Sequence, residues 1–337
     1  MTKATRRVNL ALQGGGAHGA FTWGVLDRLL EEPSLEIEGV SATSAGAMNA
    51  VALASGMATG GRAGAQATLR RLWEAVGESA RTSPLQPQFW DMLLGSDWSL
   101  TFLAFDALTR VMSPYQLNPM NINPLRDILE SVIDFDALRS ADAPIAPFLC
   151  ATNVRSGKIR VFERPEISVD AVLASGCLPF LFHAVEIGKE AYWDGGYMGN
   201  PAIFPLIYHC KSPDVVIVHI NPLKREEVPT TAAAIYNRIN EISFNSSLMR
   251  EMRAIDFVSR LIDVGTIAEG AMKRMRIHAI QDAENMSKLS VNSKLNADMA
   301  FLEGLFEAGR ARTEQWLADC YKKVGVDSSI DLRAAYL

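Results

Sequence analysis

The sequence has few cysteines, no surplus of basic residues and no long apolar run. Its four cysteines include no CxxC pair, which argues against a zinc or dithiol redox motif and favours free thiols in a reducing compartment. With 33 Lys and Arg against 38 Asp and Glu, nucleic acid is not expected as a partner. The longest uncharged stretch, residues 39–61, is too rich in small residues for a membrane span. No metal or cofactor is expected.

The chain does contain 48% hydrophobic residues, enough to bury a large core, in alternating strand-like and helix-like segments. Because a strand–helix–strand–helix order opens the chain, we expect an α/β fold with a mainly parallel sheet covered by helices. One continuous domain over residues 1–337 is the simplest organisation. Strands are expected at 8–12, 37–43, 147–153, 158–162, 191–193, 215–220 and 276–280. Helices are expected from about 17, at 44–55, 65–80, from 124, at 169–175, at 231–263 with a break near 245, and at 300–324.

A glycine-rich loop, Gly14-Gly15-Gly16-Ala17-His18-Gly19, follows the first strand. Its N–H groups and the helix behind them could bind an anion, either a phosphate or a transient oxyanion. The loop also fits the G-x-G-x-x-G dinucleotide pattern, and it could be a simple tight turn. The dinucleotide interpretation needs an acidic residue at the end of the second strand, where Thr43 and Ser44 stand instead.

A second motif, Ala42-Thr43-Ser44-Ala45-Gly46, has the form small-x-Ser-x-Gly between a strand and a helix. This is the layout of a nucleophile elbow, in which the residues two positions either side of the serine must be small. The alternative is that Ser44 merely caps the following helix.

A third motif, Asp194-Gly195-Gly196, follows a short aromatic strand and could be an ordinary turn. A serine nucleophile also needs a base. A Ser–Asp–His order is possible arithmetically with His209, His219 or His278, although the last two lie in apparent strands, where a buried imidazole is the simpler role.

Together the three motifs resemble those of the patatin-like phospholipases, over roughly residues 8–220. Residues 174–179 (Ala-Ser-Gly-Cys-Leu-Pro) also look like the family's segment before the aspartate, and residues 229–337 look like a helical C-terminal extension. The resemblance implies a three-layer α/β/α fold with extra C-terminal helices. It further implies that Ser44 is the nucleophile and Asp194 its base, without a histidine. The oxyanion donors would be Gly14, Gly15 and Gly16, and the motif-supporting residues Gly19, Ala42, Gly46, Gly195 and Gly196.

Two positions depart from the family pattern. Ala42 replaces the first glycine of the elbow, which adds one methyl group to the turn. His18 stands where the family often has Arg or Lys, so an electrostatic contribution there would depend on pH.

The resemblance implies a lipid acyl hydrolase of the phospholipase or lysophospholipase type, with a lipid or ester as substrate. The open alternatives are an esterase for neutral lipid or storage polyester, a nucleotide-binding regulator that uses the glycine loop, and a catalytically silent scaffold. The aromatic segment Phe89 to Phe105 could be a lipid-facing lid or ordinary core packing. The N-terminus leads into a strand and not an apolar signal segment, so we expect a cytoplasmic protein, with transient contact to a membrane surface.

Overall fold

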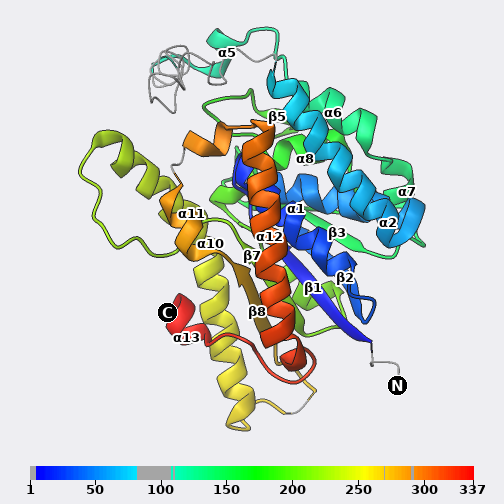
Figure 1. Cartoon of the computed structure of the whole chain (residues 1–337). Helices are drawn as coiled ribbons and strands as arrows, with labels where there is room; N and C mark the ends of the chain where they lie inside the picture. The colour runs from blue at the N-terminus through cyan, green and yellow to red at the C-terminus, as the bar shows by residue number, and fades with distance from the viewer. Residues whose placement is uncertain (1–4, 82–107, 109–110, 269, 290–291) are drawn as a thin grey trace.

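The computed structural model describes residues 5–81, 108, 111–268, 270–289 and 292–337. Within these residues one eight-stranded sheet has the order β5-β6-β3-β2-β1-β7-β8, and β4 pairs with β3 (Figure 1). Neighbours from β3 to β8 along this order are parallel, whereas β4 and β6 run antiparallel to β3, and β5 antiparallel to β6. The strands are β1 Arg6–Leu12, β2 Leu35–Ala42, β3 Ala146–Asn153, β4 Ile159–Glu163, β5 Val185–Ile187, β6 Glu190–Asp194, β7 Asp214–His219 and β8 Arg276–Gln281.

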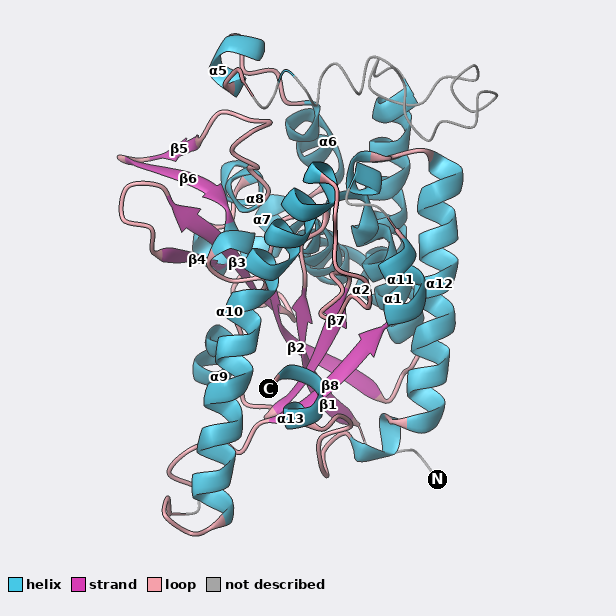
Figure 2. Ribbon diagram, turned by 90° about the vertical axis from the view of Figure 1, so that its left-hand side faces the viewer, coloured by secondary structure: helices cyan, strands magenta, loops and turns pink. Residues whose placement is uncertain are grey.

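Helices cover both faces of the sheet (Figure 2). Because side chains alternate along a strand, Leu10 and Leu12 join the core on one face of β1 and Ala11 joins the core on the other. The first face packs against α1 Gly19–Leu30, α2 Ala45–Arg81, α6 Pro124–Val132, α7 Phe135–Arg139, α8 Val169–Ser175, α11 Ala283–Lys288 and α12 Met299–Asp319. The second face packs against α9 Phe204–His209, α10 Ala232–Asp263 and α13 Leu332–Tyr336. A short helix, α5 Pro114–Leu117, lies at the periphery (Figure 1).

The expected α/β/α architecture and mainly parallel sheet are confirmed, and most expected elements are present within a few residues. The helices predicted at 44–55 and 65–80 are the two halves of α2, which Gly60 and Gly61 interrupt with non-helical backbone angles. Other details were wrong. Helix α10 runs unbroken past Asn245, and the last long helix ends at Asp319. The short strand β5 and the short helices α5, α7, α9, α11 and α13 were missed. The proposed lid, Phe89 to Phe105, lies outside the described residues. No helix in the described ranges is long and apolar enough to cross a bilayer.

Candidate active site

Ser44 lies at the apex of a sharp turn between β2 and α2. It adopts a left-handed backbone conformation with φ of 56°, which a non-glycine residue rarely takes. A Cβ atom on Gly46 would lie 2.4 Å from the Leu12 carbonyl oxygen, so a glycine is required there for the turn to pack against β1. The turn therefore has the geometry of a strained elbow that presents one serine side chain.

The glycine loop lies directly against this elbow. A Cβ atom on Gly14 would be 2.7 Å from Ser44 Cβ, closer than such atoms approach. The N–H groups of Gly15 and Gly16 donate to no atom in the described part of the chain. The Gly14 N–H is not free, however, because it donates to Asn200 Oδ1 at 2.7 Å. The expectation of three available donors is thus corrected to Gly15 and Gly16.

Asp194 ends β6 and is fully buried. Its Oδ1 accepts the Gly196 N–H at 2.7 Å, and its own N–H donates to the Cys177 carbonyl at 2.7 Å. The two glycines after it allow close packing, since a Cβ on Gly195 would lie 2.1 Å from the Cys150 carbonyl oxygen. The other carboxylate oxygen, Oδ2, has no hydrogen-bond partner among the described residues.

Ser44 and Asp194 are neighbours in space. Burial raises the pKa of Asp194 to about 6, while the Gly196 N–H, the Ser44 hydroxyl and the charge of Lys294 act in the opposite direction. The Ser44 hydroxyl is thus within reach of the carboxylate, although no hydrogen bond of full geometry joins them. At neutral pH this carboxylate is mostly ionised, yet it is roughly a hundredfold more basic than an exposed one.

Ser175 fixes the position of Ser44. The Ser44 N–H donates to Ser175 Oγ at 2.9 Å, and Ser175 Oγ donates to the Cys150 carbonyl at 2.7 Å. A Cβ atom on Gly176 would lie 3.6 Å from Ser44 Oγ. The segment that looked like the family's signature before the aspartate therefore borders the nucleophile position.

A buried network of side-chain amides supports the glycine loop, and the sequence motifs did not reveal it. Gln13 Oε1 accepts the N–H groups of Ile220 and Asn221, and Gln13 Nε2 donates to Asn245 Oδ1 at 3.2 Å. Asn221 Nδ2 donates to the Gly14 carbonyl at 2.7 Å. Gln13 and Asn221 each follow a buried parallel strand, so both lie at the carboxyl edge of the sheet, where ligand sites of α/β folds occur. This position in the sequence could have indicated that they belong to the site.

His18 does not act as a pH-dependent charge in the physiological range. Burial, together with Lys294 and Arg225, lowers the pKa of His18 to about 3, and its Nε2 lies 2.7 Å from Ser293 Oγ. The imidazole is therefore neutral at pH 7, which corrects the expectation for this position.

The three histidines considered as a base interact elsewhere. His219 bonds Tyr336, His278 bonds Asp214, and His209 lies 3.8 Å from Glu163. No group of three or more potential metal ligands gathers in the described ranges.

The sequence comparison identifies the family. The model of patatin-like phospholipases matches residues 10–207, which is more than half of the chain, and the chain therefore belongs to the patatin-like phospholipase family. At the family level it is a lipid acyl hydrolase. Asn221, Asn245 and Lys294 lie beyond the matched residues. No curated protein is significantly similar to the chain.

Two solved proteins are weakly similar. VipD from Legionella pneumophila is 16% identical with a TM-score of 0.38, over 91% of this chain and 68% of that chain. ExoU from Pseudomonas aeruginosa, solved in complex with SpcU, is 16% identical with a TM-score of 0.33, over 90% of this chain and 53% of that chain. The chain thus spans about two thirds of the first and half of the second, and similarities this low carry no argument about function.

Proposed function

We propose that the chain cleaves carboxylic esters of lipids through an acyl-enzyme on Ser44, with Asp194 as the base. Ser44 Oγ attacks the ester carbonyl while Asp194 takes the hydroxyl proton. The N–H groups of Gly15 and Gly16 hold the oxyanion that forms, and each such donor is typically worth about 2.7–4 kcal/mol. The alcohol leaves with the proton from Asp194. Asp194 then takes a proton from water, which attacks the acyl-enzyme, and returns that proton to Ser44 Oγ as the bond to the acyl group breaks and the fatty acid is released.

The observation that carries the proposal is the contact between a strained serine and a buried acid. The left-handed turn at Ser44 costs energy that a capping serine does not need. Asp194 Oδ2 is buried and has no hydrogen-bond partner among the described residues, as expected of a carboxylate oxygen that accepts a proton during the reaction. The N–H groups of Gly15 and Gly16 follow directly on Gly14, which packs against Ser44.

The substrate is proposed to be a glycerophospholipid or lysophospholipid, on the basis of the family. An esterase for neutral lipid or storage polyester would use the same catalytic groups, so these alternatives differ only in the substrate. Initial rates on phosphatidylcholine, lysophosphatidylcholine, triacylglycerol and a short polyester, measured at equal ester concentration, would rank these classes.

The decisive test is Ser44→Ala together with a fluorophosphonate label. We expect the wild-type chain to be labelled at Ser44 and the variant to be neither labelled nor active. Full esterase activity in Ser44→Ala would refute the assignment. A properly folded wild type with no labelling and no activity would favour a nucleotide-binding regulator or a silent scaffold.

We also propose that the α5 side of the protein contacts lipid surfaces transiently, from a cytoplasmic location. The segment containing α5 packs on the residues that follow Gly176, because the Tyr115 ring stacks on His183 with centroids 4.1 Å apart. Several of its neighbours expose large apolar side chains: Val111, Met120 and Ile122, together with Phe180. Large exposed apolar side chains are typical of a surface that contacts lipid or another protein.

Flotation with phosphatidylcholine vesicles tests this contact. We expect Met120→Glu to weaken flotation, because Met120 is 80% exposed in this cluster. The matched control is Val326→Glu, at a residue 71% exposed in the C-terminal loop, which should float like the wild type. Equal flotation of all three proteins would contradict the proposed contact.

A further inference from the structure

Lys294, from the C-terminal part of the chain, lies over the glycine loop. Lys294 belongs to the short 3-10 segment Asn292–Leu295, just before α12. A Cβ atom on Gly16 would lie 2.2 Å from the Lys294 carbonyl oxygen, so the two backbones are in direct contact. The neighbouring Ser293 hydroxyl contacts His18 on the same loop. The C-terminal part of the chain therefore covers the loop that offers the proposed oxyanion donors.

The Lys294 ammonium is linked to that loop through one amide. Lys294 Nζ donates to Asn221 Oδ1 at 2.7 Å, and Asn221 Nδ2 donates to the Gly14 carbonyl at 2.7 Å. An asparagine side chain that accepts at Oδ1 must present its donors on the other side. By donating to Oδ1, Lys294 thus fixes the orientation in which Asn221 Nδ2 points at the Gly14 carbonyl.

Lys294 is half-buried, and its ammonium has no ion-pair partner of its own among the described residues. The nearest acidic neighbour, Glu241, is already bound by Arg225 at 2.6 Å and by Arg238 at 3.0 Å. Within the described part of the chain, Lys294 Nζ makes the single hydrogen bond to Asn221, which leaves two of its three N–H donors unused. Even partial burial of an ammonium that forms no ion pair costs free energy, so its presence calls for another role.

The charge of Lys294 acts on the proposed base. Its positive charge lowers the pKa of Asp194, against the effect of burial. Burial lowers the pKa of Lys294 itself to about 8, with Glu241 and Asp194 opposing this change and Arg225 adding to it. At pH 7 Lys294 is therefore protonated, while His18 beside it is neutral.

We propose that Lys294 is a positioning residue of the active site, which fixes the glycine loop through Asn221 and places a positive charge beside Asp194. The inference rests on the proposed Ser44–Asp194 function and deepens it. It also makes the C-terminal segment part of the site, although the family match ends at residue 207.

The test is Lys294→Met, assayed with an uncharged ester such as p-nitrophenyl butyrate. We expect kcat to fall about tenfold with KM little changed, because the loop and the charge act on the reaction and not on binding. The acid limb of the pH profile should move to higher pH, since Asp194 loses a stabilising cation. Lys294→Arg should restore the position of that limb, as it restores the charge.

Two controls separate this role from a structural one. Thermal unfolding of Lys294→Met should occur close to the wild-type temperature, because the lost side chain is half-buried and forms no ion pair within the described ranges. Lys288→Met changes a nearby lysine that is exposed and paired with Glu284, and it should leave both rate and profile unchanged. In the double variant Lys294→Met/Asn221→Ala, kcat should be little lower than in Asn221→Ala alone, as expected if the lysine acts through that amide.

Wild-type kcat and pH profile in Lys294→Met would overturn the inference while leaving the Ser44 assignment intact. A loss of activity that merely parallels a lower unfolding temperature, with no shift of the acid limb, would also overturn it. Failure of the proposed function itself would be recognised separately, by full activity of Ser44→Ala.

Discussion

At the scale of single residues, the environment of Asp194 decides whether a carboxylate can replace a histidine as base. An ordinary carboxylate is too weak a base for a serine hydroxyl, but full burial raises the pKa of Asp194 to about 6. The Gly196 N–H and the Lys294 charge keep that value below neutrality. The residue therefore stays ionised at pH 7 and is more basic than a surface carboxylate.

The first prediction concerns pH. Because the base must be ionised, kcat/KM should fall about tenfold per pH unit below about pH 6. Rates measured between pH 4.5 and 8 on a soluble ester would show one ionisation on the acid side. A profile flat down to pH 5 would argue against Asp194 as the base.

Asp194→Asn should separate activity from stability. The raised pKa means that ionisation of Asp194 opposes folding, so its contribution lowers the free energy of unfolding as pH rises from about 4 to about 6. Asparagine can still accept the Gly196 N–H but carries no charge. We expect activity to fall about 10²- to 10⁴-fold, and the free energy of unfolding at pH 7 to stay equal or rise by up to about 3 kcal/mol. Urea titrations at pH 7 would measure this; a large loss of stability would contradict it.

The elbow offers a third residue-scale prediction. In Gly46→Ala the new methyl would collide with two backbone carbonyls, those of Leu12 and Gln13, at 2.4 and 2.8 Å. Since those carbonyls precede the glycine loop, we expect stability to fall by about 2 kcal/mol or more and activity by about a hundredfold. Ala42→Gly, at the position that departs from the family pattern, should keep activity and lose about 1 kcal/mol. Similar activity in both variants would show that the elbow does not constrain the loop.

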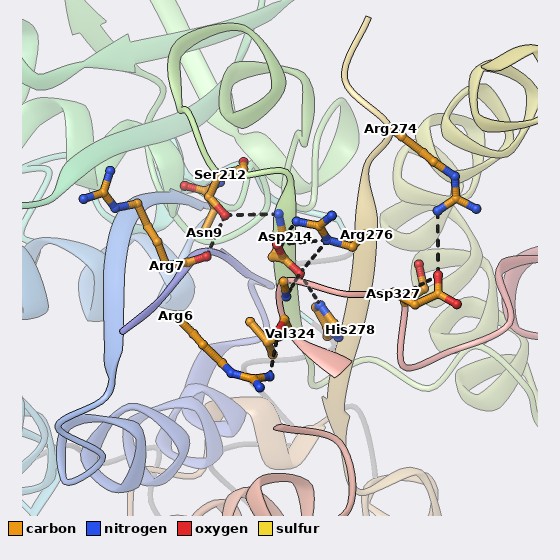
Figure 3. A network of polar contacts seen from close by, with 12 residues as sticks. Arg6, Arg7, Asn9, Ser212, Asp214, Arg274, Arg276, His278, Val324 and Asp327 are labelled. Carbon is orange, nitrogen blue, oxygen red and sulfur yellow. Dashed lines mark hydrogen bonds and ion pairs between the residues drawn. The ribbon is translucent and has the colours of Figure 1, made fainter. Parts of the chain in front are cut away.

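At the scale of elements, one buried carboxylate ties β7 and β8 to the turn that follows α12. Asp214 Oδ1 accepts from His278 Nε2 at 3.0 Å and from the Gly325 N–H at 2.9 Å, and its Oδ2 accepts from Arg276 at 2.7 Å (Figure 3). Burial opposes ionisation here, but these donors outweigh it and lower the pKa of Asp214 to about 2. Its stabilising effect is therefore present above about pH 4 and disappears as the pH falls through about 2.

Asp214→Asn should destabilise the protein by about 3 kcal/mol at pH 7, because it removes the charge that the half-buried Arg276 pairs with and disturbs the buried hydrogen bonds around it. The free energy of unfolding should also become less sensitive to pH between 4 and 2. Asp327→Asn is the control: its carboxylate is exposed and lies 3.7 Å from Arg274 (Figure 3), so a change below about 0.5 kcal/mol is expected. Equal effects of the two substitutions would contradict the role of Asp214.

The elements were predictable from sequence where a local pattern exists, and the supporting side chains were not. Apolar strands such as β1 and β7 carry a pattern within a few residues, and so do the glycine loop and the elbow. The expected break near Asn245 was wrong because this asparagine points into the core, where Gln13 and the Pro222 carbonyl satisfy its amide. The contact with Gln13 joins residues more than two hundred positions apart. A single amide side chain has no sequence spacing from which such a contact could be predicted.

At the scale of the whole molecule, the two ends of the chain form one packed unit. Helix α12 lies along α1 (Figure 1) so closely that a Cβ atom on Gly24 would be 1.9 Å from the Phe306 carbonyl oxygen. Strand β8 extends the same sheet beside β7, and Lys294 lies on the glycine loop. The site proposed for catalysis thus depends on segments from both ends, and a single domain over residues 1–337 stays our prediction.

A single domain should unfold in one cooperative transition. A pair of glycine substitutions on α12 can test this. In Gly309→Ala the methyl would lie 2.1 Å from the Phe21 carbonyl oxygen on α1, whereas a methyl at Gly304 meets nothing within 4 Å. We expect Gly309→Ala to lower the unfolding temperature, and Gly304→Ala to leave it unchanged or raise it through about 1 kcal/mol of helix propensity. Tryptophan fluorescence and far-ultraviolet circular dichroism should shift together, because Trp23 and Trp316 belong to the same core as the sheet. If Gly309→Ala instead separated the two signals into distinct transitions, the C-terminal helices would be an independent unit that merely rests on the motif-bearing core.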